Sequence, residues 1–209
     1  LAACNRDRET DKAPAPPPAA GAVETPPDAP APMTFASKTP WADVSLKLPE
    51  GLKSQTDLHA RLYAEEVRKL RQFIEGAQGA RTEAGDDAGI PLYQKIVELT
   101  VAGETSKLFS LKRVDFDYSG GANPNTLTGG ILWDKALKRQ IGFTDLFRRG
   151  ADLTVLDQAL CSAINTAKRA RVPDSASINL GDKPGSCPRA AVTEFVLTPG
   201  DTPGKAAGL

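Results

Sequence analysis

The stretches LYQKIVELTVA (residues 92–102) and KLFSLKRVDFDY (residues 107–118) decide the fold. Apolar and polar residues alternate in both, and a period of two is typical of a β-strand that buries one face. The sequence GETS between them (residues 103–106) suits a hairpin connection. A third such stretch, TLTGGILWD (residues 126–134), predicts the next strand of the same antiparallel sheet.

Two other stretches have the period of a helix. Residues 54–78 and residues 153–171 place apolar residues three or four positions apart, which predicts amphipathic helices. The apolar face comprises Leu58, Leu62, Val67, Leu70, Phe73 and Ile74 in the first helix, and Leu156, Leu160, Ile164 and Ala167 in the second. The only histidine, His59, lies away from most of the first stripe, so we expect it at the surface.

Shorter elements complete the predicted order. Residues 44–49 alternate for a short strand that a proline ends, residues 143–147 form a short turn or helix, and residues 191–197 are a candidate last strand. The order strand, helix, strands, helix, strand indicates an α+β fold. We therefore predict an antiparallel sheet with two main helices packed on it.

The first four residues, LAAC, match the end of a bacterial lipoprotein signal, in which the cysteine receives a lipid. An accidental match is the alternative. Residues 10–40 favour the lipoprotein interpretation, because they hold nine of the chain's 17 prolines, and a Pro/Ala-rich composition stays extended and solvated. We divide the chain into a lipidated N-terminus (residues 1–9, lipid on Cys4), a disordered Pro/Ala-rich tether (10–40) and an α+β domain (41–209).

Composition restricts the partners. The charges balance, with 26 basic and 26 acidic residues, so no electrostatic field favours nucleic acid. No apolar run approaches the roughly 18 residues of a membrane-spanning helix. We expect membrane contact through the N-terminal lipid, on the periplasmic side of the bacterial envelope. Asn5 is not the aspartate that retains some lipoproteins in the inner membrane, which favours the outer membrane.

Cys161 and Cys187 are the other two cysteines, with 25 residues between them. No CxxC or Cys/His spacing indicates zinc, and we expect no metal and no other cofactor. In an oxidising compartment two such cysteines pair, so we expect a structural disulfide. Two unconnected buried thiols are the alternative.

The loop YSGGANPN (residues 118–125) joins two of the predicted strands. Its glycines allow positive φ and its asparagines tolerate left-handed conformations, so turn chemistry alone explains the sequence. The alternative is a ligand site, because loops at the end of a rigid sheet are common binding positions. The residues of that candidate ligand loop are Tyr118, Gly120, Gly121, Asn123 and Asn125.

Three acidic residues are candidates for catalysis. Asp115 and Asp117 alternate on one strand face like a pair of catalytic carboxylates, but with no apolar pocket or histidine in view we interpret them as a solvated face. Asp145, at the start of a short helix, is interpreted as a cap. The sequence also lacks a Gly-x-Ser-x-Gly elbow. We therefore expect a protein without catalytic residues.

Residues 118–122 (YSGGA), Trp133 with Asp134, and residues 142–147 (GFTDLF) before a helix resemble the domain of unknown function shared by RsiV-type anti-sigma factors and PdaC-type deacetylases. In that family a tyrosine-glycine-glycine-alanine-histidine loop precedes a strand, and a leucine-aspartate-leucine-phenylalanine turn precedes a helix. The resemblance spans roughly residues 41–209. It implies an extracytoplasmic, non-catalytic module; some relatives recognise lysozyme and others accompany cell-wall enzymes.

The sequence departs from that family in two places. Asn123 stands where the family has histidine, so no metal or pH-dependent role is carried over to it. The family pattern continues past Leu209, so the resemblance implies that the sequence is incomplete at its C-terminus as well as at its N-terminus. An incomplete sheet has an exposed edge, which is prone to pairing.

Three classes of function follow. The favoured one is a lipid-anchored, non-catalytic binding or sensing module of the bacterial cell envelope that recognises lysozyme or peptidoglycan. The alternatives are a cell-wall hydrolase or deacetylase, and a structural envelope lipoprotein without a discrete ligand. The sequence leaves the oligomeric state open.

Overall fold

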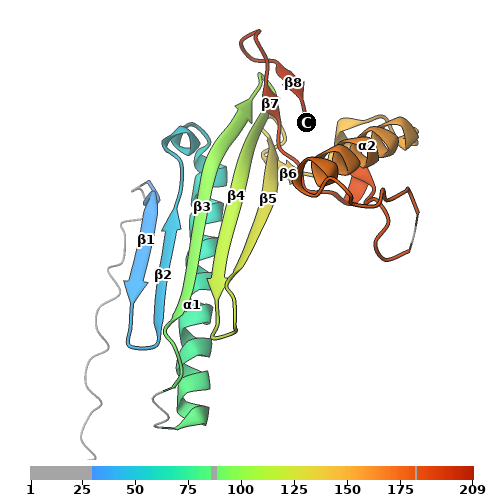
Figure 1. Ribbon diagram of the computed structural model, residues 1–209. Coiled ribbons are helices and arrows are strands. Elements are labelled where there is room, and N and C mark those ends of the chain that lie inside the picture. Colours follow the sequence, from blue (N-terminus) through green and yellow to red (C-terminus); the bar gives the residue numbers. More distant parts are fainter. Residues whose placement is uncertain (1–29, 86–88, 182) are drawn as a thin grey trace, which may run out of the picture.

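The computed structural model describes residues 30–85, 89–181 and 183–209. Cys4 and residues 10–29 of the predicted tether lie outside the described residues. The central element is a six-stranded sheet in the order β1-β2-β3-β4-β5-β6, with a long helix along one face and a second helix beside the β6 end (Figure 1). The α+β class, the mostly antiparallel sheet and the two main helices are thus confirmed.

The elements have the following bounds. The strands are β1 (Thr34–Lys38), β2 (Ala42–Lys47), β3 (Tyr93–Glu104), β4 (Leu108–Tyr118), β5 (Asn125–Asp134), β6 (Arg139–Ile141), and the small separate pair β7 (Thr198–Pro199) and β8 (Ala206–Gly208). The helices are α1 (Thr56–Ala84) and α2 (Thr154–Arg171), with three short 3-10 helices η1 (Glu50–Ser54), η2 (Phe143–Leu146) and η3 (Ala190–Val192).

One strand pair departs from the antiparallel prediction. β2 and β3 pair in parallel, with Leu46 opposite Val97, whereas the other four pairs of the main sheet are antiparallel. The reason is the connection, because α1 carries the chain back along the sheet between these two strands. Parallel neighbours require such a crossover, whereas a short turn would have made the pair antiparallel.

The core lies between α1 and the sheet face beneath it. In β4, for example, Phe109 and Leu111 point toward the helix and are almost fully buried. The residues of this core are Ala42, Val44, Leu46, Leu48, Leu52, Leu58, Leu62, Val67, Leu70, Ala77, Val97, Leu99, Phe109, Leu111, Ile131 and Trp133. The period of two in the strands and the helical stripe of residues 54–78 therefore meet in one layer, as the two patterns require.

Two predictions at the N-terminal side are wrong. β1 lies inside the segment predicted as tether, so the folded domain begins before residue 41. β1 pairs with β2 and places Phe35 against the core. The chain before β1 also passes beside α1, where the Nε2 atom of His59 lies 3.1 Å from the carbonyl oxygen of Pro32. His59 is therefore buried, because a segment distant in sequence covers its side of the helix.

Residues 191–197 do not form the predicted strand. After η3 the chain runs as an irregular segment across the second face of the sheet, the face opposite α1; we call residues 194–197 the crossing segment. A carboxylate oxygen of Glu194 accepts a hydrogen bond from the backbone N–H of Gly130 (2.9 Å), and the backbone N–H of Leu197 donates to the hydroxyl of Ser110 (3.0 Å). Hydrogen bonds between backbone and side chain hold this segment on the sheet, in place of the backbone-to-backbone hydrogen bonds that define a strand.

Small residues in the sheet make room for the crossing segment. A Cβ atom on Gly130 would lie 1.7 Å from the carbonyl oxygen of Phe195, and one on Gly103 would lie 2.8 Å from that of Leu197. Real atoms do not approach so closely. Close backbone approach thus explains Gly130 in TLTGGILWD and Gly103 at the end of β3.

A buried ion pair ties α1 to the sheet. Both guanidinium Nη atoms of Arg113 donate to the carboxylate of Glu66, at 2.7 and 2.8 Å, and Lys69 donates to the same carboxylate at 3.0 Å. Glu66 is 1% exposed. Burial raises the pKa of Glu66, but the hydrogen bonds and charge of Arg113 and Lys69 outweigh burial and lower it. Glu66 therefore stays ionised at neutral pH although it is enclosed.

The Arg113→Ala variant is expected to lose about 3 kcal/mol of unfolding free energy, because it leaves a buried carboxylate with Lys69 as its remaining cation. The measurement is urea unfolding at neutral pH, followed by circular dichroism. The control is the double variant Glu66→Leu/Arg113→Met, in which the fully buried carboxylate is removed together with its cation. Asp115, the other partner of Arg113, has a side chain that is 21% exposed and stays in contact with water, so most of the stability should return. A double variant as unstable as Arg113→Ala would contradict this explanation.

The Gly130→Ala variant is expected to lose about 1–3 kcal/mol of unfolding free energy, because the added methyl group collides with the backbone of Phe195. The neighbouring Gly129→Ala is the matched control. A Cβ atom there meets only the carboxylate of Glu194, at 3.4 Å, so its unfolding midpoint should lie close to that of the unmodified chain. Equal midpoints for the two variants would show that the crossing segment is not held where the structure places it.

Candidate functional site

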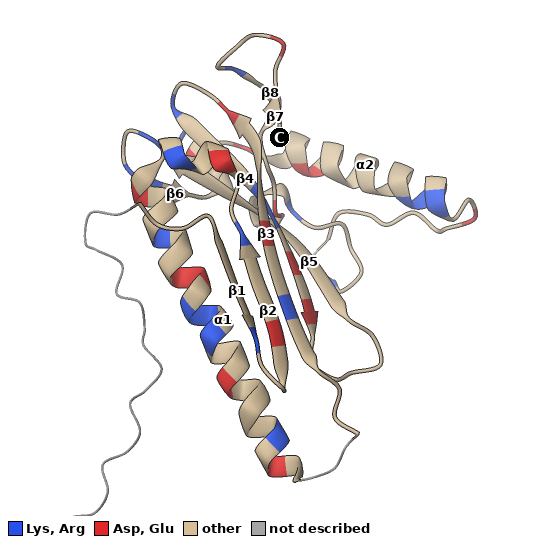
Figure 2. Cartoon of the chain, turned by 90° about the vertical axis from the view of Figure 1, so that its left-hand side faces the viewer, with Lys and Arg blue, Asp and Glu red and all other residues tan. Residues whose placement is uncertain are grey.

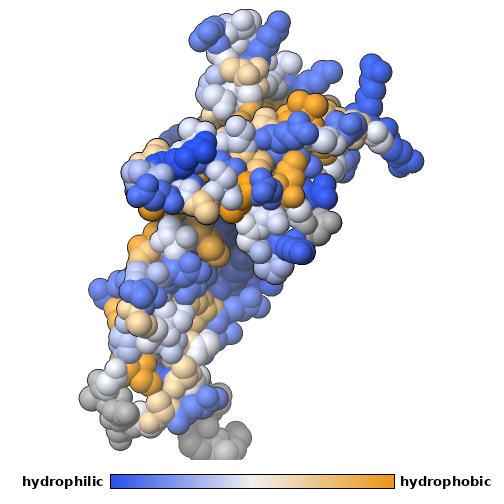
Figure 3. All heavy atoms as spheres, turned by 45° about the vertical axis from the view of Figure 1, so that its right-hand side comes forward, coloured by the Kyte–Doolittle hydropathy of each residue, from blue (hydrophilic) through white to orange (hydrophobic). Residues whose placement is uncertain are grey.

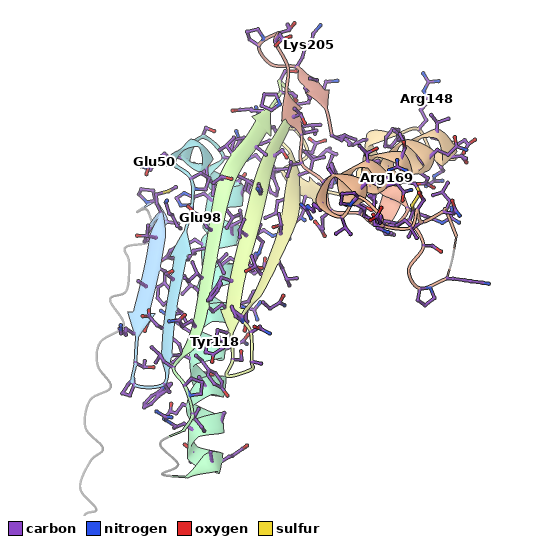
Figure 4. The ribbon with its side chains drawn as sticks, viewed as in Figure 1. Glu50, Glu98, Tyr118, Arg148, Arg169 and Lys205 are labelled. Atoms are coloured by element: carbon purple, nitrogen blue, oxygen red, sulfur yellow. A yellow bond between two sulfur atoms is a disulfide. The ribbon has the colours of Figure 1, made fainter. Side chains whose placement is uncertain are left out.

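The candidate ligand loop lies at the end of the sheet farthest from α2, where the label of Tyr118 stands in Figure 4. It joins β4 to β5. Gly120 has a φ of +86°, in the left-handed region, and a Cβ atom there would lie 3.2 Å from the ring of Tyr93. Gly121 does not have a positive φ. The turn therefore requires glycine at position 120, and the conformation accounts for only one of the two glycines.

The side chains of this loop form an exposed tip. Tyr118 is half-buried, and residues 119–125 are exposed. Ser119 donates to a carboxylate oxygen of Asp117 at 2.7 Å, which holds the start of the loop. Within the described residues, the side-chain amides of Asn123 and Asn125 make no hydrogen bond. The predicted loop residues are thus neighbours, with two amides available to a ligand.

Asp115 and Asp117 do not form a solvated face. They lie on the α1 side of β4, where a carboxylate of Asp115 accepts from the Nε atom of Arg113 (2.8 Å) and Asp117 accepts from Lys95 (2.7 Å). Burial raises the pKa of Asp117, but the hydrogen bonds from Lys95 and Ser119 outweigh it and lower that pKa. The two aspartates are therefore ion-pair partners of basic residues in the sheet.

Asp145 acts as predicted. Its carboxylate accepts a hydrogen bond from the backbone N–H of Gly142 at 2.8 Å, just before η2. The short helix in GFTDLF is thus capped by its own aspartate. Together with β6, this turn leads the chain from the sheet into the α2 region.

Polar and covalent contacts hold α2 in place. Cys161 forms a disulfide with Cys187, which confirms the predicted pairing. One turn earlier, the carboxylate of Asp157 accepts from the backbone N–H of Ala190 at 2.7 Å. One turn later, the amide of Asn165 both accepts from and donates to the backbone of Ile178, each at 2.8 Å. Positions 157, 161 and 165 share one helix face. This face of α2 therefore lies against residues 178–190, in the segment that follows the helix.

The apolar face of α2 is consequently left open. The sequence predicted that Leu156, Leu160, Ile164 and Ala167 would be the buried face. Leu156 is instead 36% exposed, Leu160 and Ile164 are half-buried, and Ala167 is exposed. The amphipathic pattern identified the helix correctly and identified its packed face wrongly, because the disulfide and the two polar side chains decide which side is held.

A hollow of about 500 Å³ lies beside this apolar face. We call it the α2 groove. Two aromatic rings contribute to its wall, since Phe143 and Phe195 contact edge to face with centroids 5.1 Å apart. Its lining residues are Phe143, Leu156, Ala159, Leu160, Ala163, Ala190, Thr193, Glu194, Phe195, Val196 and Leu209. Figure 3 shows apolar residues at the surface of the upper part of the molecule, surrounded by hydrophilic ones.

The sequence did not predict the α2 groove. Its residues come from η2, from α2, from residues 190–196, which include part of η3 and of the crossing segment, and from Leu209. These parts of the chain are distant in sequence. The available signal was an amphipathic helix with alanines at positions 159 and 163, next to the leucines. That signal does not distinguish a helix packed on a sheet from one that leaves a groove.

The charges do not form a patch of one sign on the side shown in Figure 2. Acidic and basic residues are interspersed along α1. Several of them are paired, including Lys69 with Glu65 at 2.8 Å. In the parts of the chain that the structure describes, no cluster of His, Cys, Asp or Glu is suited to a metal ion. Nor does any helix there have the length and apolar character needed to cross a bilayer.

Comparison with solved structures gives distant similarities, among them two members of one family. A DUF3298 family protein from Pseudomonas aeruginosa superposes with a TM-score of 0.39 and 17% identity, over 68% of this chain and 67% of that one. A member of the same family from Bacteroides fragilis superposes with a TM-score of 0.35 and 15% identity, over 65% of this chain and 60% of that one. No family model matches the sequence, and no curated protein matches it. Similarity this low does not assign the chain to a family.

Removal of the disulfide by Cys161→Ser/Cys187→Ser is expected to lower the free energy of local unfolding of the α2 region by up to roughly 3.5 kcal/mol, the value that the loop-entropy model gives for 26 residues of separation. The expected loss falls on α2, because the remaining contacts of that helix with the loop are a few polar bonds. Hydrogen exchange should therefore show faster exchange in α2 than in the unmodified chain, with α1 and β3 unchanged. Uniformly faster exchange in all elements would contradict this local role.

Proposed function

We propose that this chain is a lipid-anchored, non-catalytic binding or sensing module of the bacterial cell envelope. LAAC with the Pro/Ala-rich segment after it supports a lipid on Cys4 and a position on the periplasmic side, at the outer membrane. The disulfide between Cys161 and Cys187 supports an oxidising compartment. The lipid would hold the domain at the membrane, with a second acyl chain needed for a stable hold.

The α2 groove is the observation that carries the binding function. A monomeric protein covers most of its large apolar surfaces, and an exposed apolar hollow with a polar surround is typical of an interaction site. Here the helix is fixed by contacts on its other face, so the groove does not depend on a ligand for its shape. A preformed site of this kind loses little conformational entropy on binding.

The chemistry of the groove favours a protein over a glycan. Its walls are mainly aliphatic and aromatic, with the hydroxyl of Thr193 and the carboxylate of Glu194 as polar side chains. Apolar side chains of a protein loop or helix fit such walls, whereas the hydroxyls of peptidoglycan need more hydrogen-bond partners. A protein partner of the lysozyme type, which the resemblance implies, is therefore preferred to peptidoglycan.

The candidate ligand loop is at the opposite end of the sheet from the groove (Figure 4). Its exposed amides suit a polar contact, either with a sugar or with a peptide backbone. The groove and the loop are thus separate hypotheses for where a ligand binds. Variants in each can be compared in the same experiment.

Binding is measured with hen egg-white lysozyme by calorimetry and with purified peptidoglycan sacculi by co-sedimentation. We expect lysozyme binding that Leu156→Lys weakens at least tenfold, because a charge is placed in the apolar groove. The matched control is Val155→Lys on the same helix; Val155 is 73% exposed and does not line the groove, so this variant should bind normally. The double variant Tyr118→Ala/Asn123→Ala tests the loop.

The outcomes separate the two surfaces. Loss of binding in the loop variant alone would make YSGGANPN the recognition site and overturn the assignment to the groove. If the chain binds sacculi but not lysozyme, the ligand is a glycan, and the proposal of a protein partner is wrong. A folded chain that binds neither probe would overturn the proposed recognition of lysozyme or peptidoglycan.

A further inference from the structure

The outer side of β5 is partly unpaired. β6 has three residues and pairs only with Leu132, Trp133 and Asp134. Figure 1 shows no strand beyond the lower half of β5. Among the described residues, the part of β5 from Asn125 to Ile131 therefore pairs with β4 on its inner side and with no strand on its outer side.

The backbone groups on this free edge can be assigned. Successive residues of a strand direct their N–H and C=O groups to opposite edges. The N–H of Gly130 bonds the carboxylate of Glu194, not β4, so it points to the outer edge. The register of β4 and β5 has no shift, so Thr126 and Thr128 also direct their N–H and C=O groups outward. These two threonines are exposed, and no hydrogen bond satisfies their outward groups within the described residues.

The free edge lacks the usual protection against pairing. Monomeric proteins place lysine, proline or a bulge on such edges. The sequence NTLTGGI of residues 125–131 has no charge and no proline. Within this segment Leu127 is 60% exposed, although the register places it on the side of the sheet that carries the core. By contrast, the other edge strand, β1, ends in Lys38, which pairs with Asp43 at 3.2 Å.

We propose that two copies of this chain associate through the free edge of β5, as antiparallel strands related by a two-fold axis at Leu127. In this arrangement Thr126 of each copy lies opposite Thr128 of the other. Each such pair exchanges two backbone hydrogen bonds, so the two pairs satisfy all the outward groups of both threonines. Leu127 then lies directly opposite its own copy, where side chains approach closely and exposed apolar surface is buried.

A second copy fits this edge because the edge is complementary to itself. A two-fold axis requires the same segment from both partners. The register with Thr128 on the axis would pair Thr126 with Gly130, whose N–H is already bonded to Glu194. The register with Thr126 on the axis would place Thr128 opposite residue 124, which precedes β5. Only the axis at Leu127 uses the four free groups of each edge and the exposed leucine together.

The first test is the mass of the whole chain in sedimentation velocity over a concentration series. We expect a reversible dimer of twice the 22.1 kDa chain mass. Leu127→Lys should remove the dimer, because it places two like charges opposite each other. The matched control is Leu137→Lys, since Leu137 is also 60% exposed but lies in the turn after β5. A chain that is monomeric throughout the series, or a dimer that Leu127→Lys leaves intact, would overturn the proposal.

The second test fixes the register by cross-linking. In a Cys4→Ser background, Leu127→Cys should form a disulfide-linked dimer under mild oxidation. Opposed residues in a non-hydrogen-bonded pair have Cα atoms about 4.5 Å apart, which a disulfide can span. Thr126→Cys is the register control and should not cross-link to itself, because it faces Thr128. Efficient cross-linking of Thr126→Cys, or none of Leu127→Cys in a chain that dimerises, would overturn the proposed axis.

Discussion

The burial of one sheet face beneath α1 is the constraint on which the rest of the structure depends. Fully burying a leucine or valine side chain stabilises the fold by about 1.5–3 kcal/mol, and the core contains many such residues from both layers. The helix must return along the sheet to cover that face, which makes the β2–β3 pair parallel. Glu66 lies in the same layer, so its charge requires the bidentate contact with Arg113.

The second face of the sheet is organised by different forces. The crossing segment rests on it through backbone contacts with glycines and a hydrogen bond to Ser110, and it brings Phe195 to Phe143. The α2 region is attached to this assembly by a disulfide and by polar side chains at positions 157 and 165. A helix held in this way keeps its orientation without burying its apolar face. The α2 groove exists because one face of α2 is attached to the rest of the fold while its apolar face stays open.

The two surfaces proposed for interaction have different chemistry. The α2 groove is apolar and preformed, and it suits the side chains of a partner. The free edge of β5 consists mainly of backbone donors and acceptors, and it suits only another strand. The two surfaces come close together at Glu194, which lines the groove and accepts a hydrogen bond from the N–H of Gly130 in β5. The loop at residues 118–125 adds a third surface, with exposed amides and no apolar wall.

The sequence by itself determined the elements that repeat regularly. The strands β3, β4 and β5, both main helices, the cap at Asp145 and the pairing of Cys161 with Cys187 follow from periodicity, turn chemistry and cysteine count. These signals are local, or depend on a single pair of residues. The corresponding features can therefore be predicted without knowledge of the fold.

Only the tertiary structure decided which segments of the chain pack against which side chains. It buried His59 beneath the segment before β1, paired Asp115 and Asp117 with cations, and turned the leucines of α2 toward an open groove. It also turned the predicted strand at residues 191–197 into a crossing segment. Each of these depends on contacts between parts of the chain far apart in sequence, and a periodic pattern specifies that a face is apolar but not which partner, if any, will bury it.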